Sequence, residues 1–148
     1  MIFVENLSDR IFPKDLLEHA ALAVLDLSSV PAGDLTIVLV DDARIQELNR
    51  DFLGHDATTD VLSFPADEAD PDTGHRYLGD VVISFVRAVE QAIEGGHTVE
   101  AEMQLLVVHG VLHLLGHDHA SKGEKERMWA AQAKVLESLG ISPKIVHE

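Results

Sequence analysis

The sequence contains no cysteine, which excludes disulfide bonds and thiolate metal sites and fits the reducing cytoplasm. Basic residues are also few: 11 Lys and Arg stand against 26 Asp and Glu, for a formal net charge of −15. This balance argues against broad, non-specific binding of nucleic acid and against DNA as a partner. No apolar run reaches the roughly 20 residues that span a bilayer, and residues 1–10 lack the apolar core of a signal peptide. We therefore expect a cytoplasmic protein without a membrane partner.

The pattern of apolar residues predicts one α+β domain over residues 1–148. The chain is 46% hydrophobic and shows no linker, repeat or low-complexity segment. Strands are predicted at 2–7, 35–40, 58–65 and 79–85, and helices from 13, after 41, over 86–93, after 98 and over 123–139. The segment 66–76 is predicted to be a mobile loop. The resulting order, β-α-β-α-β-β-α-α-α, predicts a mixed sheet covered by helices.

The run 109–119 is the most informative part of the chain, because it places four histidines within and just after an apolar segment of helical pattern. His109 and His113 are four residues apart, so they lie on one face of a helix, one turn from each other. Two neutral imidazoles on one face are potential metal ligands. Gly116 can adopt a left-handed conformation, which ends the helix and turns the chain so that His119 can supply a third ligand.

The alternative ligand His117 is four residues from His113, but it fits the same ion poorly. On a continuous helix, His109 and His117 would be separated by a rise of roughly 12 Å, whereas ligand nitrogens lie only about 2.0–2.1 Å from a zinc ion. The spacing therefore favours His109, His113 and His119 as ligands, with a fourth position open to water. His117 is then either a surface residue or a residue that lies next to the metal ligands without binding the ion. Asp118 either orients a ligand imidazole or caps the following loop.

The same run resembles the zincin signature H-E-x-x-H-x-x-G-x-x-H in its spacing, with one difference. Gly110 stands where the signature has Glu, which is the general base for peptide hydrolysis in metalloproteases. The sequence therefore predicts a metal site of zincin geometry, on a central helix, without the base of a protease.

Three segments together resemble the YbeY family of metal-dependent endoribonucleases. They are Leu48-Asn49 with residues 59–65, the strand segment 78–84, and the run 109–119. The resemblance implies a zincin-like α+β fold and one zinc ion held by His109, His113 and His119. It also implies cleavage of single-stranded RNA in ribosomal RNA processing, at the 3′ end of the 16S precursor, and in ribosome quality control. The implied partners are the precursor RNA and the small ribosomal subunit or its assembly factors.

The sequence departs from this family at two positions that bear on RNA. His117 stands where the family usually has Tyr, and it adds an extra ligand or proton carrier. Leu53 stands where many members have an arginine thought to help with RNA. Arg50, on the same predicted helix, is the candidate that partly replaces it.

The candidate catalytic residues are therefore His117, Asp118 and Arg50, and the reaction expected is phosphodiester hydrolysis assisted by zinc. The base stays open between a metal-bound hydroxide, His117 and the 2′-hydroxyl of the RNA. Asp60 and Asp80 either cap backbone groups or belong to the active site. Two other functions stay open as well: a ribosome assembly factor with a structural metal, and a metal-dependent hydrolase of another substrate. Three histidines also suit copper or nickel.

Overall fold

The computed structural model describes residues 1–28, 33–72, 74–117 and 121–142. Its elements follow one another in the order predicted from the sequence. They are β1 (Ile2–Asn6), α1 (Lys14–Leu27), β2 (Gly33–Val40), α2 (Asp42–Leu53), β3 (Val61–Ala69), β4 (Arg76–Ser84), α3 (Phe85–Gly95), α4 (Val99–Leu114) and α5 (Lys122–Ser138).

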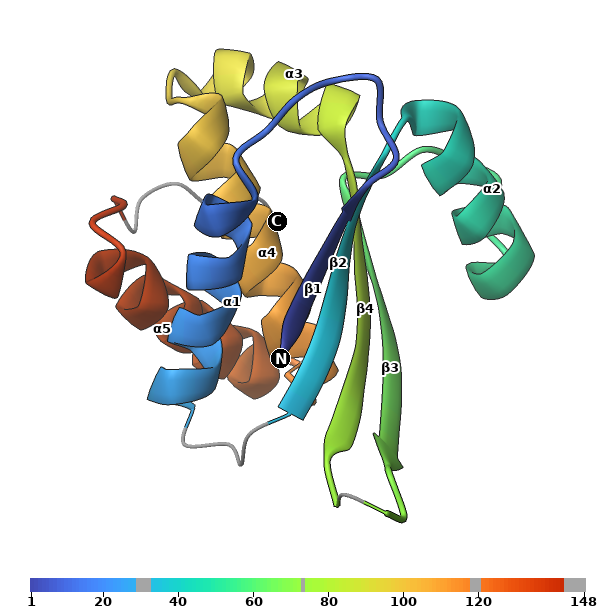
Figure 1. Ribbon diagram of the computed structural model, residues 1–148. Helices are drawn as coiled ribbons and strands as arrows, with labels where there is room; N and C mark the ends of the chain where they lie inside the picture. The colour runs from blue at the N-terminus through green and yellow to red at the C-terminus, as the bar shows by residue number, and fades with distance from the viewer. Residues whose placement is uncertain (29–32, 73, 118–120, 143–148) are drawn as a thin grey trace.

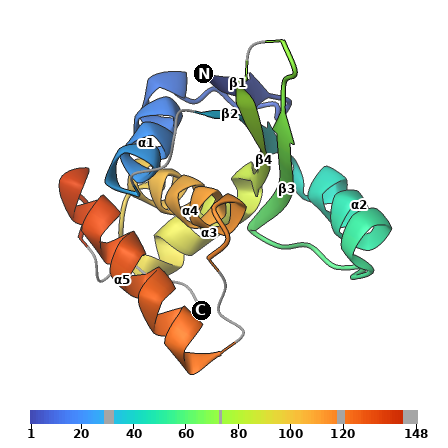
Figure 2. The ribbon, with the colours of Figure 1, turned by 90° about the horizontal axis from the view of Figure 1, so that it is seen from below.

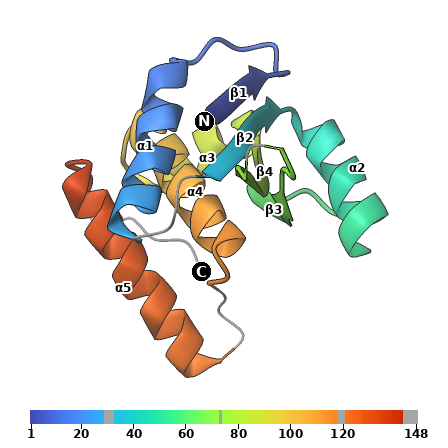
Figure 3. The same cartoon turned by 60° about the horizontal axis from the view of Figure 1, so that its bottom comes forward.

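The four strands form one mixed sheet in the order β1-β2-β4-β3 (Figure 1). β1, β2 and β4 are parallel, and β3 lies antiparallel to β4 at the edge. Helices α1, α3, α4 and α5 lie on one side of the sheet, and α2 lies alone on the other (Figures 2 and 3). The predicted α+β fold, a mixed sheet covered by helices, is confirmed.

The alternation of side chains along β2 explains why the two faces differ. Successive residues of a strand point to opposite faces. Leu35, Ile37 and Leu39 therefore enter the large core beneath α1 and α4. Val38 and Val40 point the other way, into a small cluster beneath α2. We call these the covered face and the open face of the sheet.

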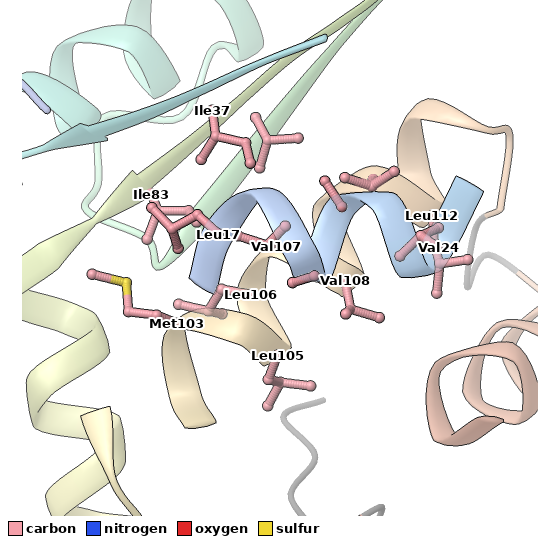
Figure 4. Close-up of a cluster of buried hydrophobic side chains, with 14 of the residues drawn as sticks. Leu17, Val24, Ile37, Ile83, Met103, Leu105, Leu106, Val107, Val108 and Leu112 are labelled. Atoms are coloured by element: carbon pink, nitrogen blue, oxygen red, sulfur yellow. The ribbon is translucent and has the colours of Figure 1, made fainter. Parts of the chain in front are cut away.

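Helix α4 crosses the covered face and is buried around most of its circumference (Figure 4). Leu105, Leu106, Val107 and Val108 are at most 2% exposed, as expected of a helix that is apolar all round. The predicted cap Thr98 starts the helix, because its hydroxyl oxygen accepts a hydrogen bond from the amide of Ala101 at 3.1 Å. No helix in the described ranges is both long and apolar enough to cross a membrane.

One prediction about the strands is wrong. The third strand does not end at Pro65 but continues to Ala69, and much of the predicted loop 66–76 belongs to the hairpin of β3 and β4. Proline cannot donate a hydrogen bond to a neighbouring strand, so sheets tolerate it at an edge or at an irregularity. β3 is the edge strand, and its pairing with β4 shifts register between Pro65 and Glu68.

Candidate functional site

The imidazoles of His109 and His113 lie together on α4, as their spacing predicts. Their Nε2 atoms are 3.2 Å apart, and their ring centroids are 4.7 Å apart at an angle of 71°. Two nitrogens bound 2.0–2.1 Å from a tetrahedral zinc would be separated by about 3.3 Å. Both rings are half-buried in an otherwise apolar helix. The separation of the two Nε2 atoms therefore fits two ligands of one metal ion.

Gln132 on α5 fixes the orientation of one of these rings, and the sequence did not identify it. Its Oε1 lies 3.0 Å from Nδ1 of His109, and the Gln132 side chain is 1% exposed. An amide oxygen only accepts, so Nδ1 of His109 donates the proton, and the lone pair of the neutral ring is at Nε2. One feature of the sequence could have identified Gln132: it is a polar residue on the apolar stripe of α5 that Met128, Val135 and Leu136 form.

The chain turns sharply after α4, as Gly116 predicts. Gly116 has φ +96°, its amide donates to the carbonyl of His113 at 3.0 Å, and the amide of His117 donates to that of Leu112 at 3.0 Å. This pair of bonds is a Schellman motif, which needs a left-handed residue at this position. His117 is half-buried just after the turn.

The third predicted ligand, His119, and the candidate catalytic residue Asp118 lie outside the described residues. Within the described ranges, no group of three or more His, Cys, Asp or Glu side chains is placed to hold a metal ion. The described part of the predicted centre is thus the pair of imidazoles on α4 and the turn that follows.

Gly110 lies where α4 touches the sheet, which explains the missing glutamate. A Cβ atom at this position would lie 2.5 Å from Cγ1 of Val81 and 3.3 Å from Oγ of Ser63. The Ser63 hydroxyl also donates to the carbonyl of Gly110 at 2.9 Å. Helix α4 and the sheet are therefore too close for any side chain at position 110. Ser63 has a structural role, because its hydroxyl joins the sheet to the backbone of α4.

Asp60 lies beside His109 and already accepts hydrogen bonds from its neighbouring backbone and from α3. Its Oδ1 accepts from the amide of Val61 at 2.7 Å, and its Oδ2 accepts from Nε2 of Gln91 at 3.3 Å. Together with Leu105 and Leu106, Asp60 also lines a cavity of about 20 Å³ that borders His109 and Gln132. The Asp60 carboxylate therefore holds the start of β3 and borders the small cavity next to His109.

Asp80 lies on the open face, on the side of the sheet away from α4. It accepts a hydrogen bond from the hydroxyl of Tyr77, which also lies 2.7 Å from Oγ1 of Thr36. Burial, and then the hydrogen bond to Asp80, raise the pKa of Tyr77 above its usual value. Of the two aspartates that the sequence left open, only Asp60 lies near the histidines.

Arg50 and Leu53 lie on α2, also on the open face. Nε of Arg50 donates to Oδ1 of Asp51 at 3.0 Å, and this hydrogen bond raises the pKa of the guanidinium. Leu53 is 48% exposed. The structure therefore places Arg50 across the sheet from His109 and His113.

The comparison with known proteins covers nearly the whole chain. The family model described as Endoribonuclease YbeY matches residues 4–140. A protein named Endoribonuclease YbeY from Brevibacillus brevis is 41% identical, over 96% of this chain and 99% of its own length. One from Carboxydothermus hydrogenoformans with the same name is 43% identical, over 95% of this chain and 99% of its own length.

A solved structure has a similar fold. The solution structure of TM1509 from Thermotoga maritima superposes with a TM-score of 0.60 at 28% identity, over 95% of this chain and 92% of that one. The family model, the sequence relatives and this fold all point to the same family. The chain belongs to the YbeY endoribonuclease family.

Proposed function

We propose that residues 1–148 act as one zinc-dependent endoribonuclease domain. Its substrate is single-stranded RNA of the small-subunit precursor, cleaved during 3′-end maturation in the cytoplasm, with the small subunit or its assembly factors as partners. The observation that carries the proposal is the 3.2 Å separation of the Nε2 atoms of His109 and His113 in a member of this family.

His109 and His113 would hold the metal through Nε2, and His119 is the proposed third ligand. When bound, the metal supplies Lewis acidity to a phosphodiester group. The chain's own contribution is to keep Nε2 of His109 deprotonated, because Gln132 holds the ring proton at Nδ1. His117 is the proposed proton carrier, since it lies on the turn that follows the pair. Asp118 stays a candidate at the same turn.

The contact between α4 and the sheet favours RNA over peptide as the substrate. A metalloprotease of this spacing needs a glutamate after its first histidine. In this chain that position is Gly110, and a side chain there would collide with Val81. The relatives named above are endoribonucleases, so neither a purely structural metal nor a hydrolase of another substrate is favoured.

The test is cleavage of an end-labelled ribosomal RNA 3′ precursor by the zinc-loaded protein, with His113→Ala and His55→Ala purified in parallel. His55 is exposed in the loop after α2, so its replacement controls for the loss of a histidine. We expect internal cleavage by the native protein and by His55→Ala, and none by His113→Ala. Equal cleavage by all three, or by none, would remove the proposed function.

A further inference from the structure

Three basic residues of this acidic chain lie close together at the start of α5. Lys122, Lys125 and Arg127 are three of its 11 Lys and Arg, within six residues. With Glu124 and Glu126 the stretch has a net charge of +1 (three cations less two carboxylates), whereas the whole chain has −15. The start of α5 is therefore one of the few stretches of this acidic chain with a net positive charge; residues 10–14, with Arg10 and Lys14, are another.

These three cations also differ in their partners from three arginines on other helices. Arg44, Arg50 and Arg87 each pair with a carboxylate of their own helix at 3.0–3.4 Å. Among the described residues, no carboxylate pairs with Lys122, Lys125 or Arg127. Their charges are thus available to a ligand. At the turn of β3 and β4, by contrast, a hollow is lined by acidic side chains (Asp34, Glu68, Asp70 and Asp72).

The start of α5 adjoins the turn that follows the histidine pair. Arg127 and Glu124 of α5 line a hollow of about 320 Å³ together with the turn after α4, including His117. The helix is held there by the hydrogen bond between Gln132 and His109. At a rise of 1.5 Å per residue, Arg127 and Lys125 lie about 8 and 11 Å along the axis from Gln132. Arg127 therefore borders the turn that follows the histidine pair, and Lys125 and Lys122 continue the positive charge along α5 away from it.

An aromatic ring accompanies these cations. Nζ of Lys125 lies 4.6 Å from the ring centroid of Trp129, which is the chain's one tryptophan and is half-buried. Surfaces that bind single-stranded nucleic acid combine cations along the phosphate backbone with aromatic rings against which bases stack. Lysine and tryptophan on successive turns of α5 have this combination.

We propose that Lys122, Lys125, Arg127 and Trp129 form the surface that holds the backbone of single-stranded RNA beside the metal centre. This inference rests on the proposed function, because it assigns the substrate-holding surface of the same site. The hollow between Arg127 and His117 then receives a phosphate group next to the one that is cleaved.

The test is the salt dependence of RNA binding, measured by fluorescence anisotropy with a short fluorescein-labelled single-stranded oligoribonucleotide. The variant Lys122→Ala/Lys125→Ala/Arg127→Ala is compared with Lys14→Ala/Arg44→Ala/Lys134→Ala. Both lose three cations, so both change the net charge from −15 to −18. The control cations lie on α1, on α2 and nearer the far end of α5. Zinc content and thermal unfolding are measured in the same samples.

We expect the slope of log K against log salt to fall in magnitude by about two in the α5 variant, since each phosphate contact contributes about 0.7. The control variant should keep the native slope, and all three proteins should bind zinc. RNA should also change the fluorescence of Trp129 in the native protein and not in the α5 variant. Arg127→Ala alone should lower the slope by about 0.7.

Equal slopes for the two triple variants, with cleavage by the native protein intact, would overturn this surface and leave the proposed function standing. The absence of both RNA binding and cleavage in the native protein would overturn the two together.

Discussion

The two faces of the sheet are built differently. The covered face supports four helices over a continuous core that includes Ile37, Val81 and Leu106. The open face supports α2 alone, over a small cluster that includes Ile45 and Val82. Beyond α2 the open face carries polar side chains such as Tyr77 and Asp80. The histidine pair lies on the covered side.

This difference fits the metal site proposed on α4. Metal ligands need fixed orientations, which come from side chains locked by packing and hydrogen bonds. Helix α4 has both, because it is buried on most sides and His109 is bound by Gln132. Helix α2 buries only Ile45 and Asn49, so its outward positions are free to change at small cost. The replacement of an expected arginine by Leu53 falls on this second helix.

The largest effect should come from a side chain at Gly110, at the contact between α4 and the covered face. Gly110→Ala places a Cβ atom 2.5 Å from Val81 and should cost about 1–3 kcal/mol of unfolding free energy. Gly110→Glu adds a buried, unpaired carboxylate, and we expect it to prevent folding. Denaturant unfolding followed by circular dichroism measures both.

The matched control is Gly123→Ala on α5, where an added Cβ would meet only Nη1 of Arg127, at an ordinary 3.6 Å. This variant should be neutral or more stable by up to about 1 kcal/mol, because alanine favours helix. A Gly110→Ala protein as stable as Gly123→Ala would show that the helix and sheet are not in close contact.

Two side-chain pairs that each contain a carboxylate offer a second comparison of the faces. On the covered face, Nε2 of His97 lies 2.6 Å from Oε1 of Glu102, whose side chain is fully buried. His97→Ala should cost about 3 kcal/mol of unfolding free energy, because it leaves a buried carboxylate without this partner. Arg44→Ala breaks an exposed pair with Glu47 on α2 and should cost at most about 1 kcal/mol. Equal costs in denaturant unfolding would contradict the difference between the faces.

A smaller effect is expected on metal affinity from Gln132. Gln132→Leu removes the acceptor that orients His109, and it should weaken zinc binding about 10–100-fold while the fold is retained. Competition with a zinc-sensitive dye measures this affinity. Gln46→Leu is the control on α2, where the Gln46 amide donates to Asp56 at 3.0 Å. If both variants bind zinc as the native protein does, Gln132 has no role in positioning the ligand.

The smallest effect should be a shift in alkaline titration on the open face. Tyr77 is the chain's one tyrosine, so ultraviolet absorption reports its ionisation alone. Burial and the hydrogen bond to Asp80 raise its pKa, so it should titrate above the usual value of about 10. The stability it contributes is present below pH 10 and is lost as the pH rises through the raised pKa. Asp80→Asn should lower this pKa, and a native value at or below 10 would contradict the contact.

Local signals predicted α4 well. The cap residue Thr98, the apolar run and Gly116, which adopts a positive φ, are signals carried by neighbouring residues. Such signals can be recognised in a single sequence. The pairing of His109 with His113 follows from the helical period alone.

Contacts between segments that are distant in the sequence could not be predicted in this way. The extension of β3 through Pro65 depends on its place at the sheet edge, and the positions of Asp60 and Asp80 depend on which face each residue meets. Gln132 reaches His109 from 23 residues away, across a helix–helix contact. Such contacts are set by packing rather than by local pattern.

The most direct test of the account is zinc stoichiometry, by equilibrium dialysis followed by elemental analysis of the native protein, His109→Ala, His113→Ala and His55→Ala. We expect one zinc per chain in the native protein and in His55→Ala, and its loss in the two α4 variants with the fold retained. Stoichiometric zinc in His109→Ala and His113→Ala would contradict a metal centre built on this pair.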